Sequence, residues 1–187
     1  MGLLEQLSKI EIKTFDAGEF LQPNTMGKIL IHGITLFDAE KSGLWGCLKG
    51  EIVSISAKTA DVIPYPVGTK IRIMYRCHGK YADIGKKELK RAVFAAYSPE
   101  DDAEVAAALK TCFGADGRSE AASKAEREAP LFAARGVLVD FSTKPAKGSD
   151  DRAKEGKPTF VDVKLSSVAG QTAEGIAAAA QKLPEVN

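Results

Sequence analysis

Five stretches of the chain have the hydrophobic pattern of β-strands, the first of them apolar on both faces, and we therefore predict five β-strands. The alternation is clearest around Ile71, Ile73 and Tyr75, which share one side of a strand while Arg72 and Arg76 share the other. The predicted strands are Lys28–Phe37, Leu44–Ala57, Thr69–Cys77, Arg135–Ser142 and Pro158–Ser167.

The spacing of hydrophobic residues becomes helical between the third and fourth strands. Leu89, Val93 and Ala96 form a stripe that predicts a helix over Ile84–Tyr97. Further helices are predicted at Ser98–Gly114, which has acidic residues in its first turn, and at the polar segment Ser119–Glu128. The alanine-rich tail Thr172–Asn187 is helix-prone, but it is too weakly amphipathic to be stable without support.

Glycine, proline and polar residues mark the breaks between these elements. Gly46 and Gly50 lie inside the second strand, where glycine indicates a bulge, a bend or the close approach of another segment. VIPYPVG (Val62–Gly68) is a proline-containing loop. The polar stretch Thr143–Pro158 carries five basic residues and is predicted to be a mobile hairpin loop without structure of its own.

This order of elements predicts a mainly β fold of the α+β class. Three strands, a helical insertion and a two-stranded hairpin fit a five-stranded OB-type barrel with helices between strands three and four, and a small sandwich is the alternative. The predicted organisation is an N-terminal arm or short helix at 1–17, a barrel domain at 18–168 with its helical insertion near 84–130, and a C-terminal helical tail at 169–187.

The length and composition are those of a globular protein. A chain of 187 residues with 44% hydrophobic residues can bury one substantial core. The longest apolar runs fall far short of the roughly 20 residues that a bilayer span requires. The first residues, MGLLEQLSKIEIK, lack a basic leader and a cleavage site, so a cytoplasmic location without membrane attachment is expected.

Positive charge is concentrated in one segment of a nearly neutral chain. Lys70–Arg91 contains eight basic and two acidic residues, although the whole protein has a formal net charge of only +1. Ser98–Glu128 has the opposite imbalance, with eight acidic residues against four basic ones. Such segregation is typical of a surface that binds a polyanion.

Few residues in the chain are suited to catalysis or metal binding. Cys47, Cys77 and Cys112 form no CxxC pair, which favours free buried thiols, and His32 and His78 are the only histidines. Neighbours such as Cys77 and His78 point to opposite faces of a strand and cannot share an ion. The sequence also lacks P-loop and GxSxG motifs, so it predicts a non-enzymatic protein without metal or cofactor.

Three separated segments resemble the OB-type single-stranded-DNA-binding proteins of bacteriophages. They are GEFLQPNTMGKILIHGITLFDAEKSGLW, VGTKIRIMYRCHGKYADIGKKELKRAVFAA and ARGVLVDFSTKPAKGSDDRAKEGKPTFVDVKLSSV, and their order along residues 18–168 carries the resemblance. It implies a protein that coats and protects single-stranded DNA, largely independently of sequence, during phage replication or recombination. Bacterial single-strand binders end in an acidic tail that recruits partners, whereas this chain ends in QKLPEVN.

The expected binding groove combines cations for phosphates with flat rings for bases. It is formed by strands two and three, the start of the basic helix and the hairpin. The candidates for phosphate contacts are Lys49, Arg72, Arg76, Lys80, Lys86, Lys87, Lys144, Lys147 and Lys157, and those for base stacking are Trp45, Tyr81 and Phe160.

Each stacking candidate also has a structural interpretation. Trp45 could pack in the core, Tyr81 could be merely exposed in its loop, and Phe160 could cover the other side of the barrel. The expected partners are single-stranded DNA and replication or recombination proteins, and a homo-oligomer is left open. The alternative function is a non-enzymatic phage structural or host-interaction module that uses the barrel for protein docking.

Overall fold

The structure is a computed structural model that describes residues 18–39, 43–97, 102–113, 131–157 and 159–184, together with Ser123, Glu126 and Ala129. The strands are β1 (Glu19–Phe20), β2 (Thr25–Ala39), β3 (Gly43–Ala57), β4 (Lys70–Arg76), β5 (Leu138–Pro145) and β6 (Val161–Ser167). The helices are the short 3-10 turn η1 (Gly79–Tyr81) and α2 (Ala82–Ala95), α3 (Asp102–Phe113), α5 (Ser149–Lys154) and α6 (Ala173–Gln181).

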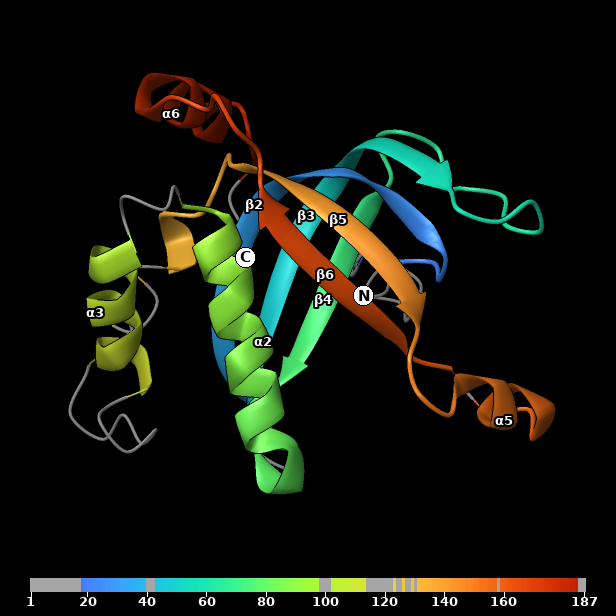
Figure 1. The fold of residues 1–187 in the computed structure, drawn as a ribbon. Helices are drawn as coiled ribbons and strands as arrows, with labels where there is room; N and C mark the ends of the chain where they lie inside the picture. The colour runs from blue at the N-terminus through green and yellow to red at the C-terminus, as the bar shows by residue number, and fades with distance from the viewer. Residues whose placement is uncertain are drawn as a thin grey trace, which may run out of the picture.

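The strands form one curled sheet, a half-barrel, in the order β1-β4-β3-β2-β5-β6 (Figure 1). All neighbours are antiparallel except β1, which runs parallel to β4. The α+β class is therefore confirmed, but the prediction of five strands was wrong. The sixth strand, β1, is only two residues long, and it exists because Glu19 and Phe20 pair with Ile71 and Arg72 more than fifty positions away.

Two long strands, β2 and β3, hold the core together. Both were predicted, although β2 begins three residues earlier and ends two residues later than its hydrophobic run. Their register shifts between Lys28 and Ile29 and again between Ile31 and Gly33, and such bulges bend a strand so that the sheet can curl. Ile29, Leu48 and Ile71 are fully buried or nearly so on the inner side of this curl.

Helix α2 covers the open side of the curl, where it contacts both β4 and β6 (Figure 1). Leu89 of α2 is fully buried. A Cβ atom built at Gly46 of β3 would come within 2.8 Å of Leu89 Cδ2, so this glycine permits the close approach of the helix. Helix α3 packs on α2 and buries Val105, Leu109 and Cys112.

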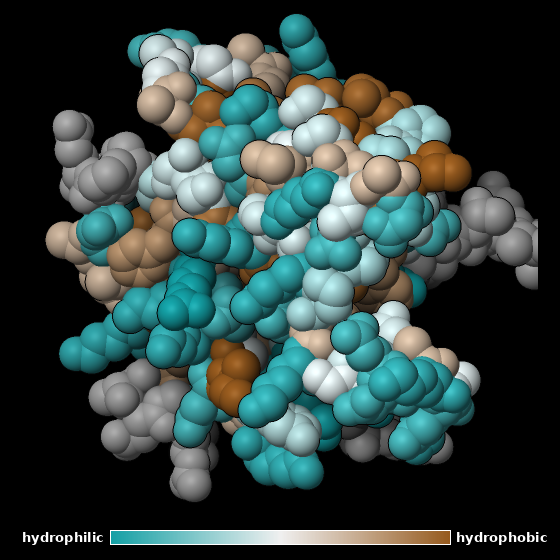
Figure 2. All heavy atoms as spheres, turned by 45° about the vertical axis from the view of Figure 1, so that its right-hand side comes forward, coloured by the Kyte–Doolittle hydropathy of each residue, from teal (hydrophilic) through white to brown (hydrophobic). Residues whose placement is uncertain are grey.

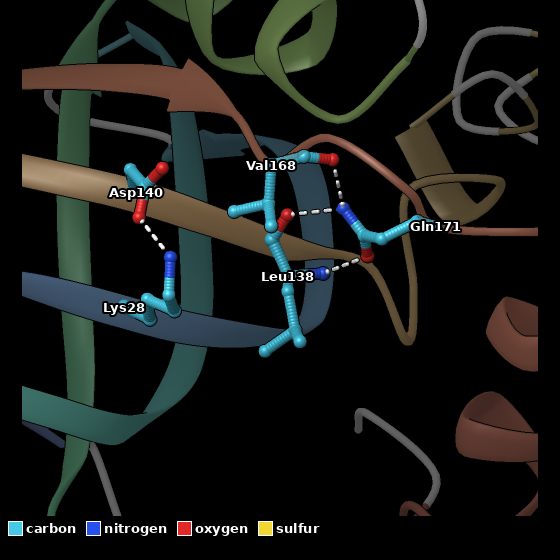
Figure 3. A network of polar contacts seen from close by, with 5 residues as sticks. All are labelled: Lys28, Leu138, Asp140, Val168 and Gln171. Carbon is cyan, nitrogen blue, oxygen red and sulfur yellow. Dashed lines mark hydrogen bonds and ion pairs between the residues drawn. The ribbon is translucent and has the colours of Figure 1, made fainter.

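Helix α6 is anchored by polar contacts to the start of β5. The Gln171 side chain accepts a hydrogen bond from Leu138 N at 2.7 Å and donates to Leu138 O at 2.8 Å and Val168 O at 3.2 Å (Figure 3). Arg135 donates to the backbone carbonyls of Leu183 and Pro184 just beyond the helix. The tail thus forms the predicted helix because the body of the protein supports it.

Four sequence predictions need correction or lie outside the described residues. The fourth strand begins at Leu138 rather than Arg135, because residues 133–136 form a turn that ends at Gly136 with φ +82°. The stretch Thr143–Pro158 is not a structureless loop, because β5 runs into it and it folds one short helix, α5. The arm at 1–17 and most of the predicted helix Ser119–Glu128 lie outside the described residues.

Candidate nucleic-acid interface

The outer face of β3 and β4 carries alternating cationic, aromatic and sulfur-containing side chains. The residues directly opposite each other are Trp45 and Arg76, Cys47 and Met74, Lys49 and Arg72, and Glu51 and Lys70. Since residues paired across a ladder share a face, these four pairs form one continuous surface. It is the predicted polar face of the third strand, and Ile71, Ile73 and Tyr75 are buried on the other side as predicted.

Exposed aromatic rings on this face are in contact with cations. The Arg72 guanidinium lies 4.4 Å from the centre of the Phe20 ring, and Phe20 is 54% exposed. The Arg76 guanidinium and the Lys80 ammonium lie 5.4 Å and 4.9 Å from the centre of the Tyr81 ring, respectively. Tyr81 is itself exposed, so both rings present a flat surface next to positive charge.

Trp45 belongs to this outer face and not to the hydrophobic core. It is paired with Phe37 on one side and with Arg76 on the other, and it is half-buried. Its ring lies 5.2 Å from that of His78, with an interplanar angle of 60°. His78 therefore lies on the Trp45 side of the sheet, whereas the preceding Cys77 is buried in the core, as their positions on a strand predict.

Burial on this face affects the protonation of nearby groups. The pKa of the Cys47 thiol is raised by burial, against the opposing influence of Lys49 and Arg72. The pKa of His32 is lowered by burial, although Glu51, whose carboxylate lies 3.5 Å from His32 Nε2, acts in the opposite direction. Cys47 therefore stays a neutral thiol and His32 favours its neutral form.

The two helical lysines among the predicted site residues, Lys86 and Lys87, lie on α2 and not on the strand face. Lys86 of α2 lies over Phe113 of α3, with its ammonium 5.8 Å from the ring centre. Lys87 is exposed on the same helix. The positive block that the sequence shows as one run is thus divided between a strand face and the helix that covers the open side of the sheet.

The hairpin between β5 and β6 provides a second cluster of predicted site residues. Phe160 is 60% exposed and is covered by the Arg152 guanidinium at 4.7 Å from its ring centre. Lys144 lies 3.8 Å from Asp162 and Lys157 lies 2.6 Å from Glu155, so these acids reduce the net charge of the hairpin. Lys147 is exposed at the hairpin.

The base of this hairpin is fixed next to the end of β1. Thr143 Oγ1 accepts a hydrogen bond from Thr25 N at 2.9 Å and lies 2.7 Å from Gln22 O, to which it can donate. Lys58 donates to Ser142 Oγ and to Thr143 O. Since Gln22 is two residues after Phe20, the hairpin begins close to the edge of the strand face. Figure 2 shows one side of the molecule, on which hydrophilic side chains predominate and hydrophobic ones form separate patches.

Sequence reasoning missed Phe20, Phe37, Lys58 and His78 as neighbours of the site. Phe20 lies in a turn-rich segment, and only its parallel pairing with β4 brings it over Arg72. Phe37 could have been identified because it ends a predicted strand next to the one that contains Trp45. Lys58 follows directly after a predicted strand, and no local pattern indicates where it points. His78 lies on the face that strand alternation predicts for it, but that pattern alone did not mark it as a site residue.

Other classes of site are not seen in the part of the chain that the structure describes. It contains no group of three or more His, Cys, Asp or Glu residues that could hold a metal ion. The cysteines at 47, 77 and 112 are buried and form no disulfide. No helix among the described residues is both long and apolar enough to cross a membrane.

Comparison with known proteins does not place this chain in a family. No family model, no curated protein and no solved structure matches it.

Proposed function

We propose that this protein binds single-stranded DNA across the outer face of β3 and β4, and that it coats the strand during phage replication or recombination. The observation that carries the proposal is the combination of exposed rings and cations on this face, above all Phe20 over Arg72 and Tyr81 beside Arg76. Rings of this kind stack with any base, and cations next to them neutralise phosphates. The phage setting comes from the sequence resemblance alone.

The arrangement of charge supports a polyanionic ligand. Lys49 and Arg72 are directly opposite each other on neighbouring strands, and like charges in this position destabilise a sheet. A phosphate between them would be attracted by both charges. Arg72 Nε, a donor, and His78 Nε2 are also buried without a hydrogen-bond partner, and a ligand acceptor atom would satisfy the Arg72 donor after a small local shift.

The strand order supports an OB-type fold. If the short β1 is left out, the strand order is β4-β3-β2-β5-β6, and α2 lies between β4 and β5 in the sequence. This is the order of a five-stranded Greek-key barrel. In a closed barrel the edge strands β4 and β6 would pair, whereas here α2 contacts both of them. In OB proteins the face formed here by β3 and β4 binds oligonucleotides. The hairpin with Arg152 and Phe160 would form the second wall of the groove, and its anchor at Thr143 places it near Phe20.

The contacts rank the candidate residues. Lys49, Arg72, Arg76 and Lys80 lie on or beside the strand face and are expected to make the main phosphate contacts. Lys144 and Lys157 contribute less because Asp162 and Glu155 already oppose their charges. Lys86, which lies over Phe113, contributes least.

The test is the titration of a fluorescent oligothymidine at several salt concentrations. The wild-type protein should bind with an affinity that falls steeply as salt rises, and should prefer the single strand to a duplex of equal length. Substituting Arg72→Gln and Arg76→Gln together removes two phosphate contacts, so the slope of log affinity against log salt should fall by about 1.4. Arg91→Gln with Lys110→Gln is the matched control, because it removes two exposed positive charges from α2 and α3.

Two outcomes would contradict the proposal in different ways. If the wild-type protein does not bind the oligonucleotide at low salt, the function is not DNA binding, and the alternative of a phage structural or host-interaction module is favoured. If it binds but both double variants lose the same affinity, the ligand does not lie on the β3–β4 face.

A further inference from the structure

The hairpin between β5 and β6 extends beyond the part of the sheet that supports it. The backbone pairing of β5 with β2 ends at Ser142, whereas its pairing with β6 continues as far as Pro145 and Val161. Helix α5 lies further out, away from the body of the sheet (Figure 1). We call residues 144–157 and 159–162 the hairpin arm. A two-stranded ribbon is at best marginally stable by itself, so the contacts at its base determine its direction.

The outer end of the hairpin arm is held together by its own contacts. Ser149 is buried, and its hydroxyl donates a hydrogen bond to Phe160 O at 2.7 Å. Ala146 N donates to the same carbonyl at 3.0 Å, and the Arg152 guanidinium lies over the Phe160 ring. The hairpin arm is therefore one unit, which carries Arg152 and Phe160 together.

The base of the hairpin arm is held at Thr143, the residue that follows the last backbone pair between β5 and β2. The Thr143 hydroxyl accepts a hydrogen bond from Thr25 N at 2.9 Å, so a side chain continues the ladder where backbone pairing has ended. The same hydroxyl lies 2.7 Å from Gln22 O, to which it can donate. The Lys58 ammonium donates to Thr143 O at 2.7 Å. We call these three contacts the Thr143 clamp.

The Thr143 clamp is attached to a segment that is itself held by specific contacts. The Gln22 side chain donates to Ile63 O at 2.9 Å and accepts from Tyr65 N at 3.0 Å, which ties it to the loop before β4. Gln22 also follows β1 by two residues, and the pairing of β1 with β4 brings Phe20 over Arg72. The clamp thus connects the hairpin arm to the segment that carries an exposed ring of the strand face.

Burial makes the Thr143 hydroxyl the critical group of the clamp. Thr25 is 0% exposed and Thr143 is 1% exposed, and a buried N–H that loses its acceptor is costly. Resting on the proposed DNA binding, we infer that Thr143 is a positioning residue whose clamp holds the hairpin arm beside the outer face of β3 and β4, so that Arg152 and Phe160 form a wall of the groove before DNA binds. A wall formed in advance lowers the entropy lost on binding.

The position of the hairpin arm can be measured without DNA. Lys154→Cys on α5 and Lys87→Cys on α2 lie at exposed positions and the native cysteines are buried, so spin labels attach to the two new thiols. Double electron–electron resonance should give a narrow distance distribution in this labelled protein. Adding Thr143→Val, which replaces the hydroxyl with a methyl group, should broaden or shift the distribution, and Thr143→Ser should restore it. An unchanged distribution with Thr143→Val would overturn the inference.

The affinity of the unlabelled proteins for a fluorescent oligothymidine tests the consequence for the groove. Thr143→Val should bind about tenfold more weakly than wild type, because the hairpin arm must then be ordered on binding, and Thr143→Ser should bind within about twofold. Gln171→Ala is the control, because it also removes hydrogen bonds from a side chain to the backbone, but at the start of β5. It should leave both the affinity and the distance distribution unchanged.

Two affinity results would overturn the inference. If Thr143→Val changes the distance distribution but binds like wild type, the hairpin arm is not part of the groove. If Gln171→Ala loses as much affinity as Thr143→Val, the loss reflects general destabilisation and Thr143 does not position the site.

The inference stays testable if Thr143→Val does not fold or if DNA binding fails. Lys58→Met removes the other half of the clamp from an exposed position; a broadened or shifted distance distribution in this variant supports the inference, and an unchanged one overturns it. If the wild-type protein binds no oligonucleotide, the proposed function fails, and the distance distributions alone decide whether the Thr143 clamp holds the hairpin arm in place.

Discussion

The packing of α2 on β3 predicts that Gly46→Ala destabilises the wild-type protein but stabilises a Leu89→Ala variant. Leu89 is fully buried, and a Cβ atom at Gly46 would lie 2.8 Å from its Cδ2, 3.1 Å from its Cδ1 and 3.4 Å from its Cγ. The methyl group of a Gly46→Ala variant thus needs space that Leu89 already occupies. Leu89→Ala empties that space.

The expected magnitudes follow from these distances. Leu89→Ala should lower the free energy of unfolding by about 2–5 kcal/mol, because it leaves a cavity under the helix. Gly46→Ala in the wild-type protein should cost about 1–3 kcal/mol through overpacking, less ~0.5–1 kcal/mol gained by replacing a strand glycine. In the Leu89→Ala background the new methyl group fills part of the cavity, so Gly46→Ala should instead stabilise the protein by about 0.5–2 kcal/mol.

Urea unfolding of the four proteins, followed by far-UV circular dichroism, measures this double-mutant cycle. The expected result is a Gly46→Ala/Leu89→Ala variant that unfolds at a higher urea concentration than Leu89→Ala alone. If Gly46→Ala destabilises both backgrounds equally, the two side chains are not in contact. The placement of α2 across the open side of the sheet would then be wrong, and with it the position of Tyr81 and Lys80 beside the strand face.

Two further predictions concern pH and the C-terminal helix. Because the pKa of His32 is lowered from 6.5 on folding, the unfolded chain binds more protons than the folded protein below that pH. The free energy of unfolding should therefore be at its full value above pH 6.5 and fall as the pH drops toward the folded-state pKa. His32→Gln should abolish this part of the pH dependence. A nuclear magnetic resonance titration of His32 with a midpoint at or above 6.5 would contradict the argument. Gln171→Ala removes the side chain that binds Leu138 and Val168, so it should lower stability by about 1–3 kcal/mol and speed amide exchange at Leu138. Gln181→Ala at the exposed end of α6 is its control, and similar exchange at Leu138 in both variants would show that Gln171 does not anchor the tail.

Local pattern predicted the long strands and most of the described helices, because burial imposes its period directly on the sequence. Alternation placed Arg72 and Arg76 on one face of β4 and Ile71, Ile73 and Tyr75 on the other. The helical stripe gave Leu89 and Val93 as buried residues of α2, and both are fully buried. The cationic half of the candidate site was therefore readable from the sequence.

Only the tertiary structure decided that Phe20 joins those cations, whereas Tyr81 was already a candidate from the sequence. Phe20 reaches Arg72 through a two-residue parallel pairing, and a pairing so short leaves no periodic signal. The same limit applies to the loop before β4, where the Gln22 side chain from a distant segment binds Ile63 O and Tyr65 N. The sequence by itself determined which residues are buried and which carry charge, because both properties follow from the residue type and its local periodicity at each position. Their assembly into one face depends on contacts between segments far apart in the chain, and no local pattern encodes those contacts.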